Sequence, residues 1–540
     1  MLVCHCAAVN DRAIRAAIAG GATDLVAVAD ACGAGGFCAG CQPTIVALLA
    51  QAGVAQPAAA ERTAPADGRR AALRSVVRAI EEDVLAAGWV GGQPLGDPSA
   101  LARRYSCTRA TLQRAVEVLE QHGVVRADPG AGGAVRVARP TATAIAEAAA
   151  LHLWSAGTHA DQLVGARRIL EGAMARAAAA TRAPAGVRRL RRWVDEAAQA
   201  ADPRDAALEL HMAVAETAGN PAFEVLSHAL IQVTRLHRGL APRRDADDTA
   251  ASLAEHRAIA AAVLGGDEDG AEEASRVHME AFYARSEPGP PDEGPVGPTS
   301  ASALARALAR EVHRRGLRPG ELLGTQQQLR YRFGVTDGIL RQAATLLEYY
   351  AVAHPRVGGE GGVVVSSPDP WPTAQLLALH LLHAGIDSRQ LFAARRPLEL
   401  AAAAAAAEAI TAGAAEQLRV QLEEERQARQ EERPADPGAV PRDVHLLLAE
   451  ASADPVVRLF VDALKLVAVR AASGGQLRRA AGAAATGQPW DDRLVADHEA
   501  LVEAVCRRDV AQATARMADH LDWLATVAGA AEAGGHAETS

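Results

Sequence analysis

Residues 254–267, AEHRAIAAAVLGGD, and residues 275–282, SRVHMEAF, each place one histidine in a pattern typical of an α-helix. The two histidines, His256 and His278, are 22 residues apart. That spacing fits two facing helices joined by a short turn, so both imidazoles can point into one bundle core. His211 lies earlier, in the helical stretch LELHMAVAETAGNPAF. These stretches predict a mainly α fold in which His256 and His278 point into the core of a helical bundle.

The same histidine pattern recurs in the second half of the chain. His445, His498 and His520 repeat it, and the last two are again 22 residues apart. Other residues repeat in step, among them Leu95 with Leu323, Leu101 with Leu329, Arg167 with Arg395 and Glu171 with Glu399. The interval grows from 228 to 234 and then 242 residues, which indicates two insertions in the second copy. One unit of about 215–230 residues therefore occurs twice.

Low-complexity segments divide the chain into domains. QPAAAERTAPADG precedes the first copy, and SEPGPPDEGPVGPTSAS separates the copies with a density of Pro and Gly that cannot sustain a helix. Five domains are expected, at residues 1–55, 69–139, 140–284, 301–367 and 368–530. Strands are expected only in the wings of the second and fourth domains.

Each copy begins with a winged-helix pattern. In the first copy the three helices read AALRSVVRAIEEDVLAAG, SALARRYSCT and TRATLQRAVEVLEQHGVV, and the wing reads DPGAGGAVRVARP. This pattern resembles the amino-terminal domain of GntR-family transcription regulators. The resemblance implies DNA contacts at Arg109, Thr111, the adjacent Arg114 and the wing glycines Gly130 and Gly132. The family's glutamate and second arginine are replaced by Pro98 and Gln113, so a fold that no longer binds DNA stays open.

The second winged-helix pattern departs further from the family. Asp337 stands at the position of the motif arginine, where a carboxylate would repel phosphate. Arg341 matches a later family arginine and is expected to contact DNA. Independent DNA binding and a role only in packing both remain open for this copy.

The rest of each copy resembles the FCD (FadR C-terminal) ligand-binding domain. The resemblance implies that two sets of residues hold a divalent metal, Zn²⁺ or Ni²⁺: His211, His256 and His278, and His445, His498 and His520. The family's aspartate, four residues before the first histidine, is Ala207 or Pro441 here. The open position suits water or a small carboxylate effector, with Arg167 or Arg395 to balance its charge. A polar pocket that binds effector without metal is the alternative.

Four cysteines near the amino terminus read C-x-C and C-x-x-C: Cys4, Cys6, Cys38 and Cys41. Four thiolates suit a [2Fe–2S] cluster or a tetrahedral zinc. Their flanks, MLVCHCAAVNDRAIRAAI and GAGGFCAGCQPTIVALL, resemble the BFD-like [2Fe–2S] domain over residues 1–53, which implies the cluster. Zinc or a vestigial site remain alternatives, and Cys32 lies off the pattern.

Composition limits the remaining possibilities. The net charge of −9 argues against a protein that is basic throughout, although arginine is in local excess over residues 69–139 and 301–367. Sparse cysteines, no leader and no membrane-length apolar stretch predict a cytoplasmic protein without membrane contact. Neither a Rossmann fingerprint nor a P-loop is found, and no enzyme activity is expected.

These patterns together predict a transcription regulator that binds double-stranded DNA. Since GntR regulators bind palindromes as homodimers, two fused copies predict a pseudo-dimer within one chain, with a further homodimer of chains left open. The cluster would add redox or iron sensing. The alternative is an electron-transfer protein of iron or nitrogen metabolism whose repeats only dock partners.

Overall fold

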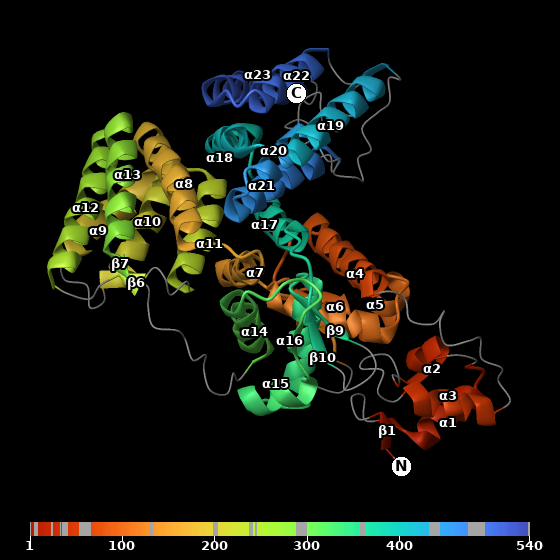
Figure 1. Ribbon diagram of the computed structural model, residues 1–540. Helices are drawn as coiled ribbons and strands as arrows, with labels where there is room; N and C mark the ends of the chain where they lie inside the picture. The colour runs from red at the N-terminus through yellow and green to blue at the C-terminus, as the bar shows by residue number, and fades with distance from the viewer. Residues whose placement is uncertain are drawn as a thin grey trace. The chain divides into compact units, whose positions relative to one another are not determined.

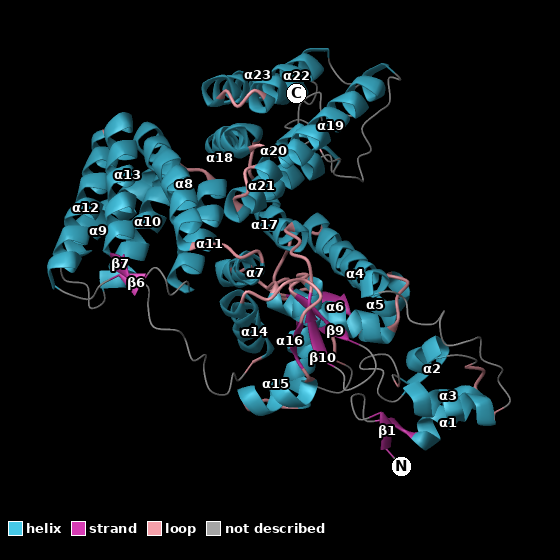
Figure 2. Ribbon diagram, viewed as in Figure 1, coloured by secondary structure: helices cyan, strands magenta, loops and turns pink. Residues whose placement is uncertain are grey.

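The computed structural model shows a chain built almost entirely of helices (Figures 1 and 2), which confirms the mainly α prediction. It describes residues 2–4, 9–22, 25–32, 34, 42–52, 66–128, 133–197, 203–236, 241–242, 246–287, 300–356, 362–430, 443–473 and 492–537. The chain forms two compact units. One comprises Met1–Gly157 and Glu293–Pro372, and the other comprises Thr158–Asp292 and Thr373–Ser540.

The amino-terminal segment is a small helical fold with one short sheet. Its elements are β1 (Leu2–Cys4), β2 (Val9–Asn10), α1 (Asp11–Ala19), α2 (Leu25–Cys32) and α3 (Gln42–Gln51). The Asn10 side chain accepts a hydrogen bond from the backbone N–H of Ala13 and so caps α1. Ile14, Val28, Ile45 and Leu49 are fully buried and form the centre of its core.

The first winged helix follows. Its elements are α4 (Ala66–Ala86), β3 (Pro94–Gly96), α5 (Pro98–Arg104), α6 (Arg109–Gln121), β4 (Val125–Ala127) and β5 (Val135–Val137). The strands form an antiparallel sheet in the order β3-β5-β4, with Arg126 opposite Arg136. Helix α5 begins at Pro98, after Asp97 caps it by accepting from the N–H groups of Ser99 and Ala100. The Pro98 departure from the family motif is therefore compatible with the helix start.

The second winged helix has the same topology. Its elements are α14 (Ala301–Arg315), β8 (Leu322–Gly324), α15 (Gln326–Phe333), α16 (Asp337–Tyr349), β9 (Ala353–Arg356) and β10 (Gly362–Val365). The sheet order β8-β10-β9 matches that of the first. Thr336 caps α16 as Thr108 caps α6, because the side chain of each accepts a hydrogen bond from the backbone N–H three residues later. Gly316 ends α14 at φ +60°, a conformation that L side chains rarely adopt.

The two winged helices pack on each other within one unit. Helix α6 contacts α16, and α4 also contacts α16. Arg114 of α6 pairs with Glu348 of α16 at 2.7 Å, and Arg74 of α4 pairs with Asp369 at 2.6 Å. Arg74 also donates to the backbone carbonyl of Tyr349. Charged side chains therefore hold the copies together.

Helix α7 (Ala142–Ser155) follows the first winged helix but packs on α14 of the second. Glu147 forms an ion pair with Arg306, and the guanidinium of Arg310 lies over the Trp154 ring, 5.4 Å from its centroid. The helix that follows the first winged helix thereby covers part of the second winged helix.

Two helical bundles make up the other unit. The first contains α8 (Ala160–Thr181), α9 (Pro184–Glu196), α10 (Pro203–Ala218), α11 (Pro221–Leu236), α12 (Ala246–Gly265) and α13 (Glu268–Arg285). The second contains α17 (Trp371–His383), α18 (Ser388–Ala409), α19 (Ala412–Gln430), α20 (Val444–Ala451), α21 (Pro455–Ser473), α22 (Asp492–Cys506) and α23 (Val510–Ala537). Helix α8 packs on α10, α11, α12 and α13, and α18 packs on α20, α21, α22 and α23. Each bundle is thus built around its own central helix, α8 in the first and α18 in the second.

The bundles meet through reciprocal contacts. The Nε2 of Gln162 donates to the carbonyl of Ala453 at 3.2 Å, and the Nε2 of its counterpart Gln390 donates to the carbonyl of Gly219 at 3.1 Å. Paired contacts of this kind are typical of two-fold interfaces between identical subunits. One chain therefore contains an internal pseudo-two-fold.

One detail of the fold prediction is wrong, because strands are not confined to the wings. Strands β1 and β2 pair near the amino terminus, and β6 (Ala241–Pro242) pairs with β7 (Ser286–Glu287) beside the first bundle. Segments of two or three residues are too short to show the alternation that identifies a strand in sequence. Among the described residues, no helix is both long and apolar enough to span a membrane.

Candidate metal centres and DNA-contact residues

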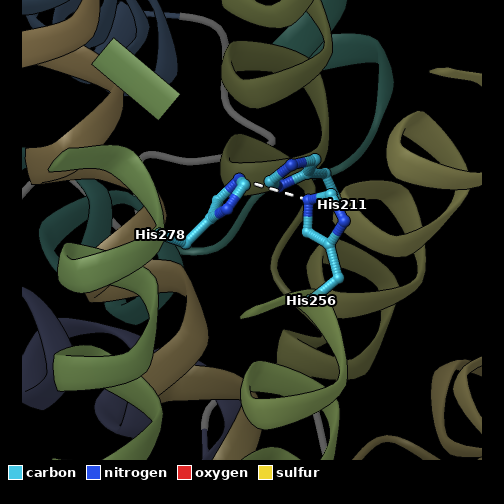
Figure 3. A group of neighbouring side chains, drawn as sticks. All are labelled: His211, His256 and His278. Atoms are coloured by element: carbon cyan, nitrogen blue, oxygen red, sulfur yellow. Dashed lines mark hydrogen bonds between the residues drawn. The ribbon is translucent and has the colours of Figure 1, made fainter. Parts of the chain in front are cut away.

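Three histidines converge inside the first bundle. His211 projects from α10, His256 from α12 and His278 from α13, and one nitrogen of each lies within 4.8 Å of the others. All three are buried. Figure 3 shows the three rings turned toward a common centre. The Nε2 atoms of His256 and His278 lie 3.2 Å apart. The tight hairpin between α12 and α13, where Asp267 caps α13, brings the last two together.

Carboxylates lie behind two of these rings. The Nδ1 of His211 lies 2.8 Å from a carboxylate oxygen of Glu171, and the Nδ1 of His278 lies 3.0 Å from Glu255. Glu171 in turn pairs with Arg167 at 2.6 Å. Since an ionised carboxylate only accepts hydrogen bonds, Glu255 places the imidazole proton of His278 on Nδ1 and leaves its Nε2 lone pair free.

The second bundle repeats this arrangement. The Nε2 of His520 lies 3.2 Å from that of His445 and 3.3 Å from that of His498. Here every ring has a carboxylate at Nδ1. Glu399 contacts His445, Glu425 lies 2.7 Å from His498, and Asp497 lies 3.4 Å from His520.

The electrostatics keep Glu171, Glu255 and Glu399 charged, and burial keeps His256 and His520 neutral. Burial alone would raise the pKa of Glu171 and Glu399, but Arg167 and Arg395 respectively outweigh it, together with the adjacent histidines, and hold each pKa far below the usual range. The same balance lowers the pKa of Glu255 to about 2, through His278 and Arg285. Burial lowers the pKa of His256 and of His520 well below the usual value.

These residues fit a bound divalent cation. In the second bundle, where a carboxylate faces every Nδ1, the converging Nε2 atoms present lone pairs to one another at hydrogen-bond distance with no proton between them. A cation at the centre converts that repulsion into coordination, and neutral imidazole is a preferred ligand of zinc and nickel. The donor set therefore suits metal better than an empty polar pocket.

The position of the family's fourth ligand differs between the bundles. Ala207 is half-buried on α10, one turn before His211, and offers no donor. Pro441 lies outside the described residues. Asp443 caps α20 two residues before His445, but its second oxygen pairs with Lys465 at 2.5 Å. Burial favours the neutral acid, yet Lys465 and His445 lower the pKa of Asp443 far below its usual range.

Both predicted effector arginines lie beside the histidines. Arg167 and Arg395 are buried, each paired at 2.6 Å with the glutamate one turn later, Glu171 or Glu399. The guanidinium of Arg395 lies over the Phe392 ring, and its Nη2 has no hydrogen-bond partner among the described residues. That buried donor is available to an anionic ligand.

The predicted DNA contacts divide into exposed and packed residues. Arg109 is exposed at the first position of α6, and Thr111 is half-buried, with its hydroxyl 3.0 Å from that of Thr108. Arg114 instead pairs with Glu348. Arg341 lies in the same contact between α6 and α16. Its charge opposes the rise that burial causes in the pKa of Glu117. Gly130 and Gly132 fall outside the described residues.

In the second winged helix, Asp337 is exposed and pairs with Arg330 at 3.0 Å. The positive charge of Arg330 thus offsets the negative charge of Asp337, which stands where the family motif has arginine.

The cysteine site is only partly described. Cys4 ends β1, whereas Cys6, Cys38 and Cys41 lie outside the described residues. Cys32, predicted to stand apart from the ligands, donates from Sγ to the carbonyl of Val28 within α2.

The sequence analysis missed the carboxylates that orient the histidines. Two of them have a sequence signal, because an acid directly precedes the second histidine in both copies: Glu255 before His256 and Asp497 before His498. Each supports the third histidine of its triad across the hairpin. Glu425 has no such signal.

Comparisons with known proteins found matches to parts of the chain. A family model described as "FCD domain" matches residues 162–281 and again residues 390–522. A second, described as "BFD-like [2Fe-2S] binding domain", matches residues 2–51. Among solved structures, "Streptococcus agalactiae GntR" is similar at 18% sequence identity with a TM-score of 0.29, covering 39% of this chain and 99% of that chain. No curated protein matches the chain.

Proposed function

Because this chain carries a BFD-like [2Fe–2S] domain followed by two FCD domains, we propose that it is a DNA-binding transcription regulator of the GntR/FadR type. The observation that carries the proposal is the pair of histidine triads, each inside a bundle that follows a winged helix in the chain. This order, a DNA-reading fold followed by a ligand-binding fold, occurs twice in one polypeptide. A homodimeric regulator would carry it once in each of its two chains.

The DNA-contacting surface in this proposal centres on the amino terminus of α6. Its N–H groups, the exposed Arg109 guanidinium and the Thr111 hydroxyl suit a phosphate and the adjacent major-groove edge. Arg114 and Arg341 contribute mainly to the contact between α6 and α16, because both lie in that helix pair. The wing glycines Gly130 and Gly132 remain proposed contacts.

Each bundle would sense a small carboxylate through its metal. Three imidazoles hold Zn²⁺ or Ni²⁺, and the missing aspartate leaves a position that an effector carboxylate fills. The free Nη2 of Arg395 balances its charge in the second bundle. The [2Fe–2S] cluster, ligated by Cys4, Cys6, Cys38 and Cys41, would add the redox or iron input.

A gel-shift assay with the full chain tests the proposal. Fragments of the source genome should yield a specific operator, retained at salt concentrations that release random DNA. The same assay with oxidised and reduced protein, and with a chain lacking residues 1–55, measures the cluster's contribution. Redox-active protein that retains no specific DNA under any of these conditions would instead support electron transfer.

A further inference from the structure

The two histidine triads differ in one buried group, and the difference lies on equivalent helices. Helices α9 and α19 begin at equivalent positions, 228 residues apart, and the fully buried Leu190 and Leu418 mark the shared register. In that register, Trp193 and Ala197 of the first copy correspond to Gln421 and Glu425 of the second. Two substitutions thus replace an indole and a methyl group by an amide and a carboxylate.

One residue of each pair contacts the middle histidine of its triad: Trp193 contacts His256, and Glu425 contacts His498. In the second bundle the carboxylate of Glu425 lies 2.7 Å from Nδ1 of His498, and Gln421 donates to the other oxygen of Glu425 at 3.5 Å. Glu425 is only 1% exposed, so its carboxylate and the imidazole meet away from water. In the first bundle the Trp193 ring meets the His256 ring edge-on instead, with centroids 6.2 Å apart.

The consequence for the metal follows from the orientation of each ring. A carboxylate at Nδ1 fixes the ring plane, keeps the proton on Nδ1 and makes Nε2 more basic. His498 has such a partner. Among the described residues, the Nδ1 of His256 has none, so neither its tautomer nor its ring rotation is fixed in this way. Removing an orienting partner of a metal-bound histidine typically costs about 10- to 100-fold in metal affinity.

We propose that Glu425 is a positioning residue that makes the second triad the tighter metal site and leaves the first triad readily exchangeable. The inference rests on the proposed metal binding by both triads. It assigns the two bundles different tasks: the second holds its ion permanently, and the first gains or loses its ion as free metal varies.

Cobalt(II) titration of the full, cluster-loaded chain in competition with a chelator tests this. The visible bands of cobalt bound by histidine differ from those of cobalt bound by thiolate, which separates the triads from any binding at cysteines. We expect two steps whose dissociation constants differ by about tenfold or more. His520→Ala should abolish the tighter step, and His278→Ala the weaker one.

Two further variants examine Glu425 itself. Glu425→Gln should weaken the tighter step by about tenfold while leaving the weaker step unchanged. Glu424→Gln, an exposed neighbour on the same helix, is the matched control and should change neither. Urea unfolding of each variant shows whether the bundle stays intact.

The outcomes separate the inference from the proposed function. Two steps of equal affinity, or a Glu425→Gln protein with an unchanged tight step, overturn the inference and leave metal sensing standing. No cobalt at either triad overturns both.

Discussion

The rings of His122 and Tyr350 lie 5.9 Å apart, centroid to centroid. Each residue occupies the same position in its own winged helix. The register is clear from the next residues, Gly123 and Ala351, which both adopt positive φ. A residue that meets its own counterpart marks the axis of a two-fold arrangement. His122 also pairs with Glu81 at 2.7 Å, with both side chains buried. The two winged helices are therefore fixed to each other at a polar centre.

Arg114→Ala should destabilise this pairing. Glu348 is almost fully buried, so losing Arg114 leaves a carboxylate without its partner, at a cost of about 3 kcal/mol. Urea unfolding followed by a probe in the winged helices measures the loss. The control is Arg78→Ala, which removes an exposed pair with Glu82 and should cost well under 1 kcal/mol. Equal effects of the two substitutions would refute a structural role for Arg114.

DNA affinity should depend more on the side chain at position 109 than on the side chain at position 337. Arg109→Ala should cost about 1–3 kcal/mol of binding if the side chain reads a guanine, and should flatten the salt dependence if it contacts phosphate. Asp337→Arg should leave binding unchanged or strengthen it. Because the two reading helices differ here, sequences selected from random DNA should be asymmetric. A silent Arg109→Ala combined with loss of binding in Asp337→Arg would reverse the assignment.

Protein purified without oxygen should contain one [2Fe–2S] cluster per chain. The C-x-C and C-x-x-C spacing supplies four thiolates, and the matching domain model covers them. Visible absorption, together with iron and acid-labile sulfide analysis, gives the content. Cys38→Ser should abolish it, whereas Cys32→Ser should not. A colourless protein with one zinc and no sulfide would contradict the cluster.

Ala207→Asp should tighten metal binding in the first bundle. Residues 207 and 211 lie one turn apart on α10, so a carboxylate at 207 shares a face with His211. Chelator competition should show a lower dissociation constant for the first site only. Ala206→Asp, on a different face of the helix, provides the comparison. An unchanged constant for Ala207→Asp would place the metal elsewhere.

Metal-free bundles should lose stability as the pH falls from 7.5 to 5.5. Burial lowers the pKa of His256 and His520, so the unfolded chain binds protons near its ordinary pKa of about 6.5 while the folded chain does not. Each such histidine should remove about 1 kcal/mol over that range. Below about pH 4.5, Glu171 and Glu399 add to the loss, because their pKa is depressed in the folded state. Urea midpoints that stay constant with pH would argue against neutral buried imidazoles.

Much of the fold and the histidine centres could be predicted from sequence because each signal is local or repeated. The 22-residue spacing of His256 and His278 reflects one helical hairpin, and its recurrence at His498 and His520 supports the pattern. Caps such as Thr108 and Thr336 stand at the helix starts that the motif implies.

The relationships that the sequence does not reveal depend on contacts between distant segments. Glu425 follows Glu423 and Glu424, and only the packing of α19 on α22 distinguishes the buried one from its exposed neighbours. Arg114 occupies a DNA-contact position in the motif, but its partner Glu348 lies 234 residues later, on another copy. Local pattern cannot reveal either relationship.

The reciprocal bonds of Gln162 and Gln390 join halves that one polypeptide already connects. Two separate subunits would dissociate on dilution, and the fraction of paired subunits would fall as their number in the cell fell. Tethered halves meet at an effective concentration set by the connecting chain, commonly in the millimolar range, whatever the amount of protein. The pairing therefore survives at a few molecules per cell, and each half is free to accumulate changes that a symmetric pair would have to tolerate twice.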